Sequence, residues 1–130
     1  MQKLPTPPKE SIIYEDKNLY VCLALFSITT GHTIIVWKED TEDLHSLPRK
    51  DYEYLMDLVD ITRNILLESL HIEKVYLMYM DEVKQVHWHL IPRYEEKGIN
   101  VLLHTPVETK EFPLAPALRL HFAEQIKDFV

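Results

Sequence analysis

Two histidines separated by a single residue lie in the segment 85–93, whose sequence is Gln-Val-His-Trp-His-Leu-Ile-Pro-Arg. The segment is typical of a β-strand, in which alternate side chains share a face and lie about 7 Å apart. One face carries the apolar side chains of Val86, Trp88 and Leu90. The other face carries Gln85, His87 and His89. Three polar side chains on one face of an apolar strand require hydrogen-bonding partners or a ligand.

The spacing of His87 and His89 leaves three kinds of site open. Histidine pairs of this spacing occur in metal sites, where Asp81, Glu82 or a residue distant in sequence could complete the ligand set. The two rings can also be structural, each satisfied by hydrogen bonds. In a third kind of site, one imidazole attacks phosphorus and forms a phosphohistidine. Its neighbour then holds the phosphoryl oxygens or protonates the leaving group.

The elements that must position these histidines are predicted to form an antiparallel sheet. Apolar, β-branched or alternating segments indicate strands at residues 11–14, 19–26, 32–37, 75–80 and 85–93. Gly31 marks the break before the third of these strands, and Pro92 ends the last one because proline cannot donate to a strand ladder.

Two segments have the spacing of amphipathic helices. Between residues 48 and 70, apolar or weakly polar side chains recur on one helical face: Leu55, Leu58, Val59, Thr62, Leu66 and Leu70. Pro48 suits the first turn of this helix. Apolar residues spaced four apart predict a C-terminal helix through Leu118, Phe122 and Ile126. The pattern predicts an α+β fold, in which one long helix packs on an antiparallel sheet.

A chain of 130 residues, 46% hydrophobic and 27% charged, is long enough to bury the core of one domain. Residues 1–10 hold three prolines and no periodic pattern, so they are predicted to be a flexible N-terminal tail. Residues 11–130 are predicted to form the single domain.

Composition excludes several classes of protein. Gly31 and Gly98 are the only glycines, which rules out a Gly-rich phosphate loop. The net charge of −7 opposes binding to nucleic acid or anionic membranes, so neither is a predicted partner. Cys22, the single cysteine, lies in an apolar run and is predicted to be a buried thiol in a reducing cytoplasm. There is no N-terminal signal core, and no apolar run approaches the ~18–20 residues of a membrane span.

The order of several elements closely resembles the histidine triad (HIT) family. The matching segments are Gly-His-Thr-Ile-Ile-Val at 31–36, Leu-His-Ser-Leu at 44–47, the long helix, and the His-x-His strand ending in Pro-Arg. The resemblance covers residues 14–94, about two thirds of the chain. The hydrolase branch of the family, with the fragile-histidine-triad proteins and their bacterial relatives, looks nearest.

The resemblance implies a role for each residue of the expected site. His87 corresponds to the family's nucleophile and His89 to the third histidine, which contacts phosphate. Gln85 stands where the family has its first histidine. His32 corresponds to the earlier histidine that hydrogen-bonds within the triad. Two further residues are predicted to contact substrate, Arg93 and Trp88, with a surface ion pair and core packing as their respective alternatives.

The resemblance also implies a five-stranded antiparallel sheet, a homodimer, and hydrolysis or transfer of nucleotidyl groups at an α-phosphate without an obligatory metal or other cofactor. We therefore expect a cytoplasmic enzyme in which His87 attacks the α-phosphorus of a nucleoside phosphate, a dinucleoside polyphosphate or a nucleotidyl conjugate. Water then cleaves the phosphohistidine.

Two alternative functions remain open. Gln85, Ala24 and Glu82 depart from the family's pattern, because Ala24 stands where the family has an acid or Asn that grips the ribose hydroxyls. Glu82 and the neighbouring Asp81 occupy a shortened phosphate-contacting loop. A nucleotide-binding or scaffold protein with weak or no turnover is therefore one alternative. The other is a metal-dependent protein with His87, His89 and His32 as ligands.

Overall fold

Five strands form the central sheet of the computed structural model, which describes residues 4–129. They are β1 (Ile12–Glu15), β2 (Leu19–Leu23), β4 (Thr33–Trp37), β5 (Lys74–Tyr79) and β6 (His87–Arg93). Neighbouring strands are antiparallel, and their order across the sheet is β1-β2-β4-β6-β5. The predicted α+β class and five-stranded antiparallel sheet are confirmed.

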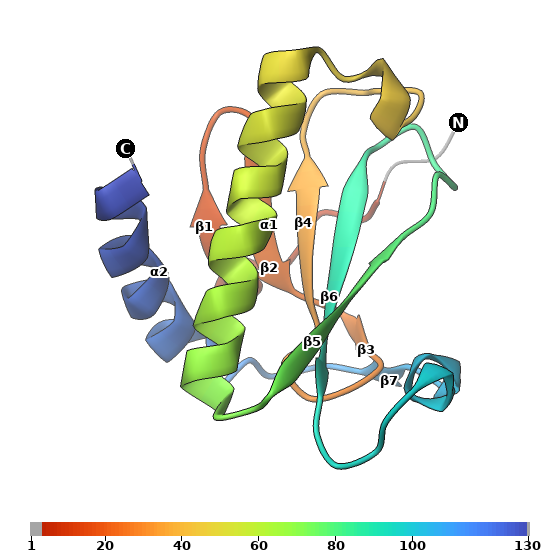
Figure 1. Cartoon of the computed structure of the whole chain (residues 1–130), viewed down its shortest axis with the longest axis vertical. Helices are drawn as coiled ribbons and strands as arrows, with labels where there is room; N and C mark the ends of the chain where they lie inside the picture. The colour runs from red at the N-terminus through yellow and green to blue at the C-terminus, as the bar shows by residue number, and fades with distance from the viewer. Residues whose placement is uncertain (1–3, 130) are drawn as a thin grey trace.

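Both predicted helices are present. Helix α1 (Arg49–Leu70) crosses one face of the sheet, and α2 (Ala115–Phe129) packs beside α1 and β1 (Figure 1). A separate two-stranded ribbon pairs β3 (Phe26–Ser27) with β7 (Val107–Glu108). Three short 3-10 turns complete the chain: η1 (Lys9–Ser11), η2 (Leu44–Ser46) and η3 (Ile99–Leu103). Neither helix of the described chain is long and apolar enough to cross a membrane.

The main hydrophobic core lies between α1 and the sheet. The helix buries one stripe of side chains: Leu55, Leu58, Val59, Thr62, Ile65 and Leu66. From the sheet, Val21, Ile35 and Leu90 are fully buried. Burying each such aliphatic side chain contributes about 1.5–3 kcal/mol, so this layer holds the central strands against the helix. At the β1 edge, the ring of Phe122 stacks on Tyr14 with centroids 4.7 Å apart.

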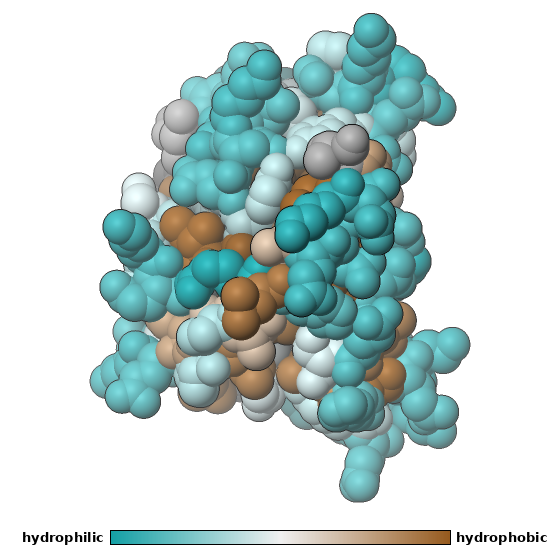
Figure 2. All heavy atoms as spheres, turned by 90° about the vertical axis from the view of Figure 1, so that its left-hand side faces the viewer, coloured by the Kyte–Doolittle hydropathy of each residue, from teal (hydrophilic) through white to brown (hydrophobic). Residues whose placement is uncertain are grey.

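The side of the molecule formed by α2 is largely hydrophilic, with hydrophobic residues between the polar ones (Figure 2). Arg119 of α2 donates to the carbonyl oxygen of Ile12 from Nε at 3.1 Å and from Nη2 at 2.9 Å. These bonds tie α2 to the start of β1. Leu120 on the same helix is 70% exposed.

The face of the sheet opposite α1 carries the predicted site. In the register of β4 and β6, Ile34 lies opposite His89 and Val36 lies opposite His87. Residues directly opposite one another in an antiparallel pair share a face. The register of β2 and β4 adds two more residues to this face. We call this surface the histidine face; it comprises Tyr20, Cys22, Ile34, Val36, His87 and His89.

Residues 4–8, called the N-terminal arm below, lie against the histidine face. The side chain of Leu4 packs against a buried cluster made of Tyr20, Cys22 and Val36. The carbonyl oxygen of Pro8 accepts hydrogen bonds from the backbone N–H and the hydroxyl of Ser11, which join the arm to η1. The division into a tail (1–10) and a domain (11–130) stays a prediction.

Candidate active site

His87 lies at the start of β6 with one of its ring nitrogens occupied. Its Nδ1 is 2.9 Å from the backbone carbonyl oxygen of Gln85. A carbonyl oxygen can only accept, so Nδ1 carries the proton of this hydrogen bond. In the neutral ring Nε2 is therefore left with a lone pair. The side chain is 9% exposed, so the ring is neither fully sealed nor freely solvated.

A chain of hydrogen bonds determines which ring nitrogen carries the proton in the other two histidines. The backbone N–H of Ile28 donates to Nδ1 of His32 at 3.0 Å, so the proton of the neutral His32 ring is on Nε2. This Nε2 is 3.0 Å from Nδ1 of His89, to which it donates. Consequently the neutral His89 ring carries its own proton on Nε2. The result is an N–H donor on His89 and a lone pair on His87, on rings whose centroids are 5.2 Å apart.

Burial keeps two of these rings uncharged. Burial, with a smaller contribution from the neighbouring His89, lowers the pKa of His32 to about 3. Burial, with a smaller contribution from the neighbouring His87, lowers the pKa of His89 to about 4. Both rings are neutral near pH 7, so the hydrogen-bond chain from Ile28 to His89 holds in the tautomers derived above.

The side chain of Gln85 does not reach the histidine rings through any of its hydrogen bonds. Its Nε2 donates to the carbonyl oxygen of Trp37 at 3.3 Å, and its Oε1 accepts from the backbone N–H of Leu4 at 3.0 Å. The backbone carbonyl of Gln85 is the group that contacts His87. The catalytic role predicted for Gln85 stays a prediction.

Of the two predicted substrate contacts, Trp88 lies away from the histidines. It pairs with Ile35 and Tyr79, on the α1 side of the sheet, and its ring centroid is 5.0 Å from that of Tyr79. Within the described residues its buried Nε1 has no hydrogen-bond partner. A role for Trp88 in substrate binding stays a prediction.

Arg93, the other predicted contact, ends β6 on the same side as His87 and His89 by strand alternation. Its Nη2 is 3.8 Å from Oε1 of Glu73, and its buried Nε has no partner in the described part of the chain. Its role in substrate binding also stays a prediction.

Asp81, which the family resemblance placed beside the phosphate, points elsewhere. Its Oδ1 accepts from the backbone N–H of Leu44 at 3.1 Å and from the hydroxyl of Tyr79 at 2.5 Å. Tyr79 lies opposite Trp88, on the α1 side of the sheet. The carboxylate is thus held away from the histidine face, which removes one source of repulsion for an anionic ligand.

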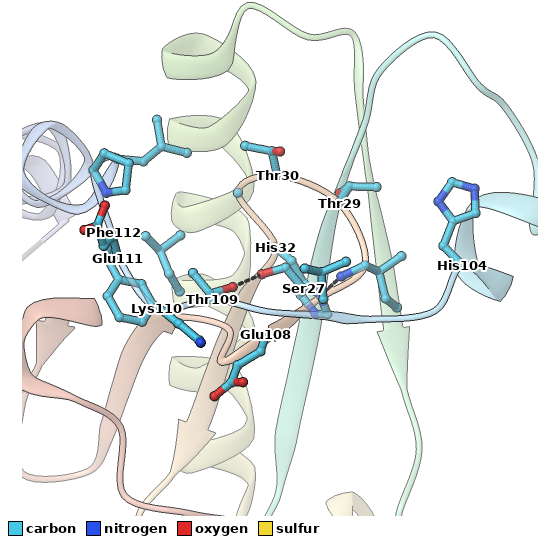
Figure 3. Close-up of a pocket in the computed structure, with 16 residues that line it drawn as sticks. Ser27, Thr29, Thr30, His32, His104, Glu108, Thr109, Lys110, Glu111 and Phe112 are labelled. Carbon is cyan, nitrogen blue, oxygen red and sulfur yellow. Dashed lines mark hydrogen bonds between the residues drawn. The ribbon is translucent and has the colours of Figure 1, made fainter.

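A cavity of about 690 Å³ opens beside His32, between the loop before β4 and the segment that leads to α2 (Figure 3). Its lining includes the side chains of Ser27, Thr29, Thr30, Thr109, Lys110 and Phe112. Two bonds hold the walls together: the Thr109 N–H donates to the Leu25 carbonyl at 2.6 Å, and the hydroxyls of Ser27 and Thr109 are 2.8 Å apart. The loop that presents the Ile28 N–H to His32 is therefore anchored to the segment after η3.

The described residues contain no group of three or more His, Cys, Asp or Glu side chains arranged to hold a metal ion. The facing nitrogens of His32 and His89 hydrogen-bond to each other instead. The geometry of these residues thus gives the metal-dependent alternative no support. Cys22, predicted to be buried, is 1% exposed in β2, and burial raises the pKa of its thiol to about 12.

Sequence reasoning did not single out Leu4, Ile28 or Thr109. Leu4 and Ile28 act on the site through backbone N–H groups, which side-chain type does not reveal. Thr109 lies in a segment without helical or strand periodicity, so no local pattern could indicate its contact with Ser27.

Comparison with known proteins shows the family to which the chain belongs. A family model described as HIT domain matches residues 7–96, more than half of the chain. The chain belongs to the histidine triad family. Among its relatives is an uncharacterized HIT-like protein of Methanocaldococcus jannaschii, 28% identical over 94 residues, which are 67% of this chain and 71% of that protein. The predicted family is confirmed, whereas the hydrolase branch stays a prediction.

Several solved structures share the fold. A zinc-bound protein of Mycobacterium smegmatis has a TM-score of 0.74 at 22% identity, covering 94% of this chain and 89% of that one. A hypothetical histidine triad nucleotide-binding protein of Sulfolobus tokodaii has a TM-score of 0.69 at 17% identity, covering 92% and 85%. The diadenosine triphosphate hydrolase of Plasmodium falciparum, with cyclomarin A, has a TM-score of 0.62 at 14% identity, covering 95% and 82%. At sequence identities this low, the similarity shows a shared fold alone.

Proposed function

We propose that this HIT protein is a nucleotide hydrolase or transferase that acts at an α-phosphate through a phosphohistidine on His87. The observation that carries the proposal is the bond from His87 Nδ1 to the Gln85 carbonyl, because it leaves Nε2 as a lone-pair nucleophile. The substrate class is a nucleoside phosphate, a dinucleoside polyphosphate or a nucleotidyl conjugate.

In the proposed reaction, Nε2 of His87 attacks the α-phosphorus. The bond from phosphorus to the leaving group breaks, and the leaving group departs with the bonding electron pair. A water molecule then attacks the phosphohistidine and the N–P bond breaks. The free imidazole is regenerated, and a nucleoside monophosphate is released. Transfer to another acceptor in place of water would make the same protein a transferase.

His89 has the proton needed to support this reaction. Its Nε2–H donates to a non-bridging phosphoryl oxygen, where negative charge grows in the transition state. The low pKa of His89 means that this donor is a neutral ring at physiological pH. His32 keeps the His89 proton on Nε2 by donating to Nδ1. His32 is therefore a positioning residue in this proposal.

Two of the structurally similar proteins agree with this substrate class. The Sulfolobus tokodaii protein is described as nucleotide-binding, and the Plasmodium falciparum protein as a diadenosine triphosphate hydrolase. Asp81 is bonded to Leu44 and Tyr79, so its carboxylate does not repel an anion at His87 and His89 despite the net charge of the chain.

The proposed nucleophile is tested by single-turnover hydrolysis of a dinucleoside polyphosphate. His87→Ala is expected to lower the rate at least about 10³-fold, since the covalent route is lost. His45→Ala, on the exposed turn η2, is the matched control and is expected to keep the wild-type rate. Wild-type enzyme quenched in alkaline denaturant should carry nucleotide bound to His87, because the N–P bond of a phosphohistidine survives base but is hydrolysed in acid. Equal rates for His87→Ala and wild type would refute the assignment.

The same samples separate an enzyme from a binding protein that lacks turnover. Buried Ala24, at the position where the family resemblance expects a ribose-binding side chain, favours this second function. Adenosine monophosphate should raise the unfolding temperature whether the protein is an enzyme or only binds nucleotides. Stabilisation by the nucleotide with no hydrolysis in the wild type would favour the binding protein.

We also propose that the protein is a homodimer joined through β5. This strand is at the edge of the sheet, and its Leu77 is 40% exposed. Exposed edge strands offer unpaired backbone groups to a second chain. Two copies of β5 paired antiparallel about a two-fold axis would bring Lys74 of each copy near Asp81 and Glu82 of the other. This charge complementarity favours a second copy over another partner.

A further inference from the structure

The N-terminal arm is stiff and has an anchor at its far end. Three of its five residues are prolines, whose rings fix the backbone angle φ near −65°. The backbone N–H of Leu4 bonds to the side chain of Gln85, and the Leu4 side chain packs on Tyr20, Cys22 and Val36 of the histidine face. A stiff segment with η1 at one end and this bond at the other needs few further contacts to stay in place.

Gln85 contacts both the arm and the nucleophile. Its side chain is 7% exposed and bridges Trp37 of β4 and Leu4 of the arm, at 3.3 Å and 3.0 Å. Its own carbonyl oxygen is 2.9 Å from Nδ1 of His87. Because the side chain is held at both polar atoms, the rotation of the peptide group that carries this carbonyl is restricted.

We infer that Gln85 is a positioning residue that latches the N-terminal arm over the histidine face, and that the latched arm, whose Leu4 packs on Val36 opposite His87, is a wall at one side of the surface where substrate meets His87. Removal of the latch would release the wall and loosen the carbonyl that orients His87. The inference concerning substrate rests on the proposed function, whereas the latch itself does not.

The residue type suits this role. A carboxamide presents a donor and an acceptor at one terminus whatever the pH. A protonated imidazole at the same place would have two donors and no acceptor for the Leu4 N–H. At the position where the family resemblance expects a histidine, the glutamine side chain makes both bonds, to Leu4 and to Trp37.

Nuclear magnetic resonance tests the latch without any substrate. In Gln85→Met, which keeps the length of the side chain but not its bonds, solvent exchange of the Leu4 amide is expected to speed up roughly 5- to 10-fold, as for loss of one hydrogen bond. The ¹⁵N shifts of the His87 ring should move from the Nδ1–H form toward a mixture of tautomers. Gln125→Met, on the exposed side of α2, should change neither. Unchanged exchange and tautomer in Gln85→Met would overturn the inference.

A second pair of variants lies outside the sheet, so the fold is not at risk. Leu4→Pro lacks the N–H donor, whereas Leu4→Ala keeps it and shortens only the side chain. For the hydrolysis of a dinucleoside polyphosphate, Leu4→Pro is expected to raise KM roughly 5- to 10-fold with kcat unchanged, and to exceed the effect of Leu4→Ala. Gln85→Met should also lower kcat. Equal KM values for Leu4→Pro and wild type would refute the arm as a wall, while absent turnover in the wild type would refute only the proposed function.

Discussion

The ring proton is not on the same nitrogen in His32, His87 and His89, because each ring has a different hydrogen-bonding neighbour. The Gln85 carbonyl requires a proton on Nδ1 of His87, whereas the Ile28 N–H excludes one from Nδ1 of His32. His89 takes its tautomer from His32. One ring thus offers a lone pair and the next offers a donor, which is the division of roles that attack on a phosphoryl group requires.

The buried histidines should make the protein sensitive to mild acid. A histidine in the unfolded chain has a pKa of about 6.5, whereas the folded values are about 3 for His32 and about 4 for His89. Between pH 6.5 and 4 the unfolded chain therefore binds more protons, and the free energy of unfolding falls as the pH falls. From pH 7 to pH 5 we expect a loss on the order of 2 kcal/mol for each of the two residues.

Urea unfolding of wild type and His32→Asn at pH 7 and pH 5 measures this loss. The variant does not titrate at position 32. Its free energy of unfolding should therefore fall less between pH 7 and pH 5 than that of wild type, by about the contribution of one histidine. The pKa of Asp16 is already below its ordinary value, so this carboxylate titrates outside the range and does not interfere. The same decrease in both proteins would contradict a buried neutral His32.

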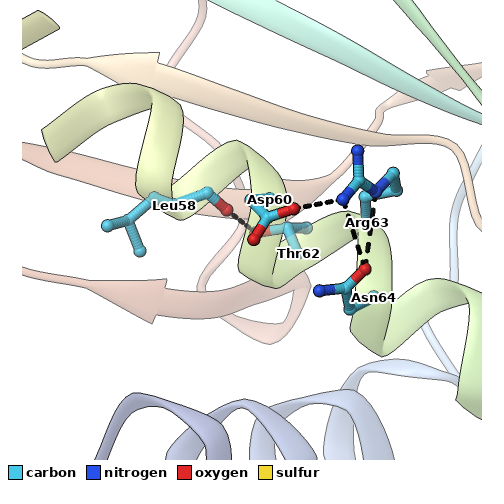
Figure 4. A network of polar contacts seen from close by, with 5 residues as sticks. All are labelled: Leu58, Asp60, Thr62, Arg63 and Asn64. Atoms are coloured by element: carbon cyan, nitrogen blue, oxygen red, sulfur yellow. Dashed lines mark hydrogen bonds and ion pairs between the residues drawn. The ribbon is translucent and has the colours of Figure 1, made fainter. Parts of the chain in front are cut away.

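At the scale of elements, α1 and the loop before β4 bring the histidines together. The buried Thr62 of α1 satisfies its hydroxyl by donating to the Leu58 carbonyl at 2.7 Å, while Asp60, Arg63 and Asn64 bond to one another on the outward side (Figure 4). The helix can therefore pack flat on the sheet without an unpaired polar group.

The loop before β4 turns at Gly31, which has a φ of +87°. A Cβ atom at this position would lie 2.8 Å from Cδ1 of Leu70 and 3.4 Å from Cγ of Pro92. Gly98 has a similar φ of +93°, but nothing lies within 4 Å of its Cβ position. Both glycines therefore have a positive φ, and they differ in the space available to a side chain.

Gly31→Ala and Gly98→Ala make a matched pair for chemical unfolding. Both should lose about 1 kcal/mol because alanine is strained at positive φ. Gly31→Ala should lose about 1–3 kcal/mol more, since Leu70 or the loop must move. Equal losses in the two variants would show that the contact with Leu70 is relieved without cost.

At the scale of the whole molecule, the β5 edge of the sheet is where the proposed second copy binds. We expect light scattering after size-exclusion chromatography to give the mass of a dimer for wild type and of a monomer for Leu77→Lys, because a charge at the centre of the paired strands is costly to bury. Leu120→Lys replaces a 70% exposed leucine on α2 and should remain a dimer. A wild-type monomer at micromolar concentration would refute the proposed dimer.

Local sequence patterns were enough to predict the sheet, the long helix and the strand face that carries His87 and His89. These features follow from local periodicity, since a strand alternates every residue and a helix buries every third or fourth one. The order of the elements was sufficient to predict the HIT family from the residues.

The groups that contact the histidines come from segments far apart in the sequence, and the folded chain was needed to find them. The Leu4 N–H contacts Gln85 across 81 residues of chain, and the Asp81 carboxylate joins the start of η2 instead of the histidine face. The Ile28 N–H sets the tautomer of His32 from within a loop whose anchor is Thr109. Such bonds depend on how the loops close over the finished sheet, and backbone groups are the same in every residue type except proline. No local pattern of side chains can therefore specify them.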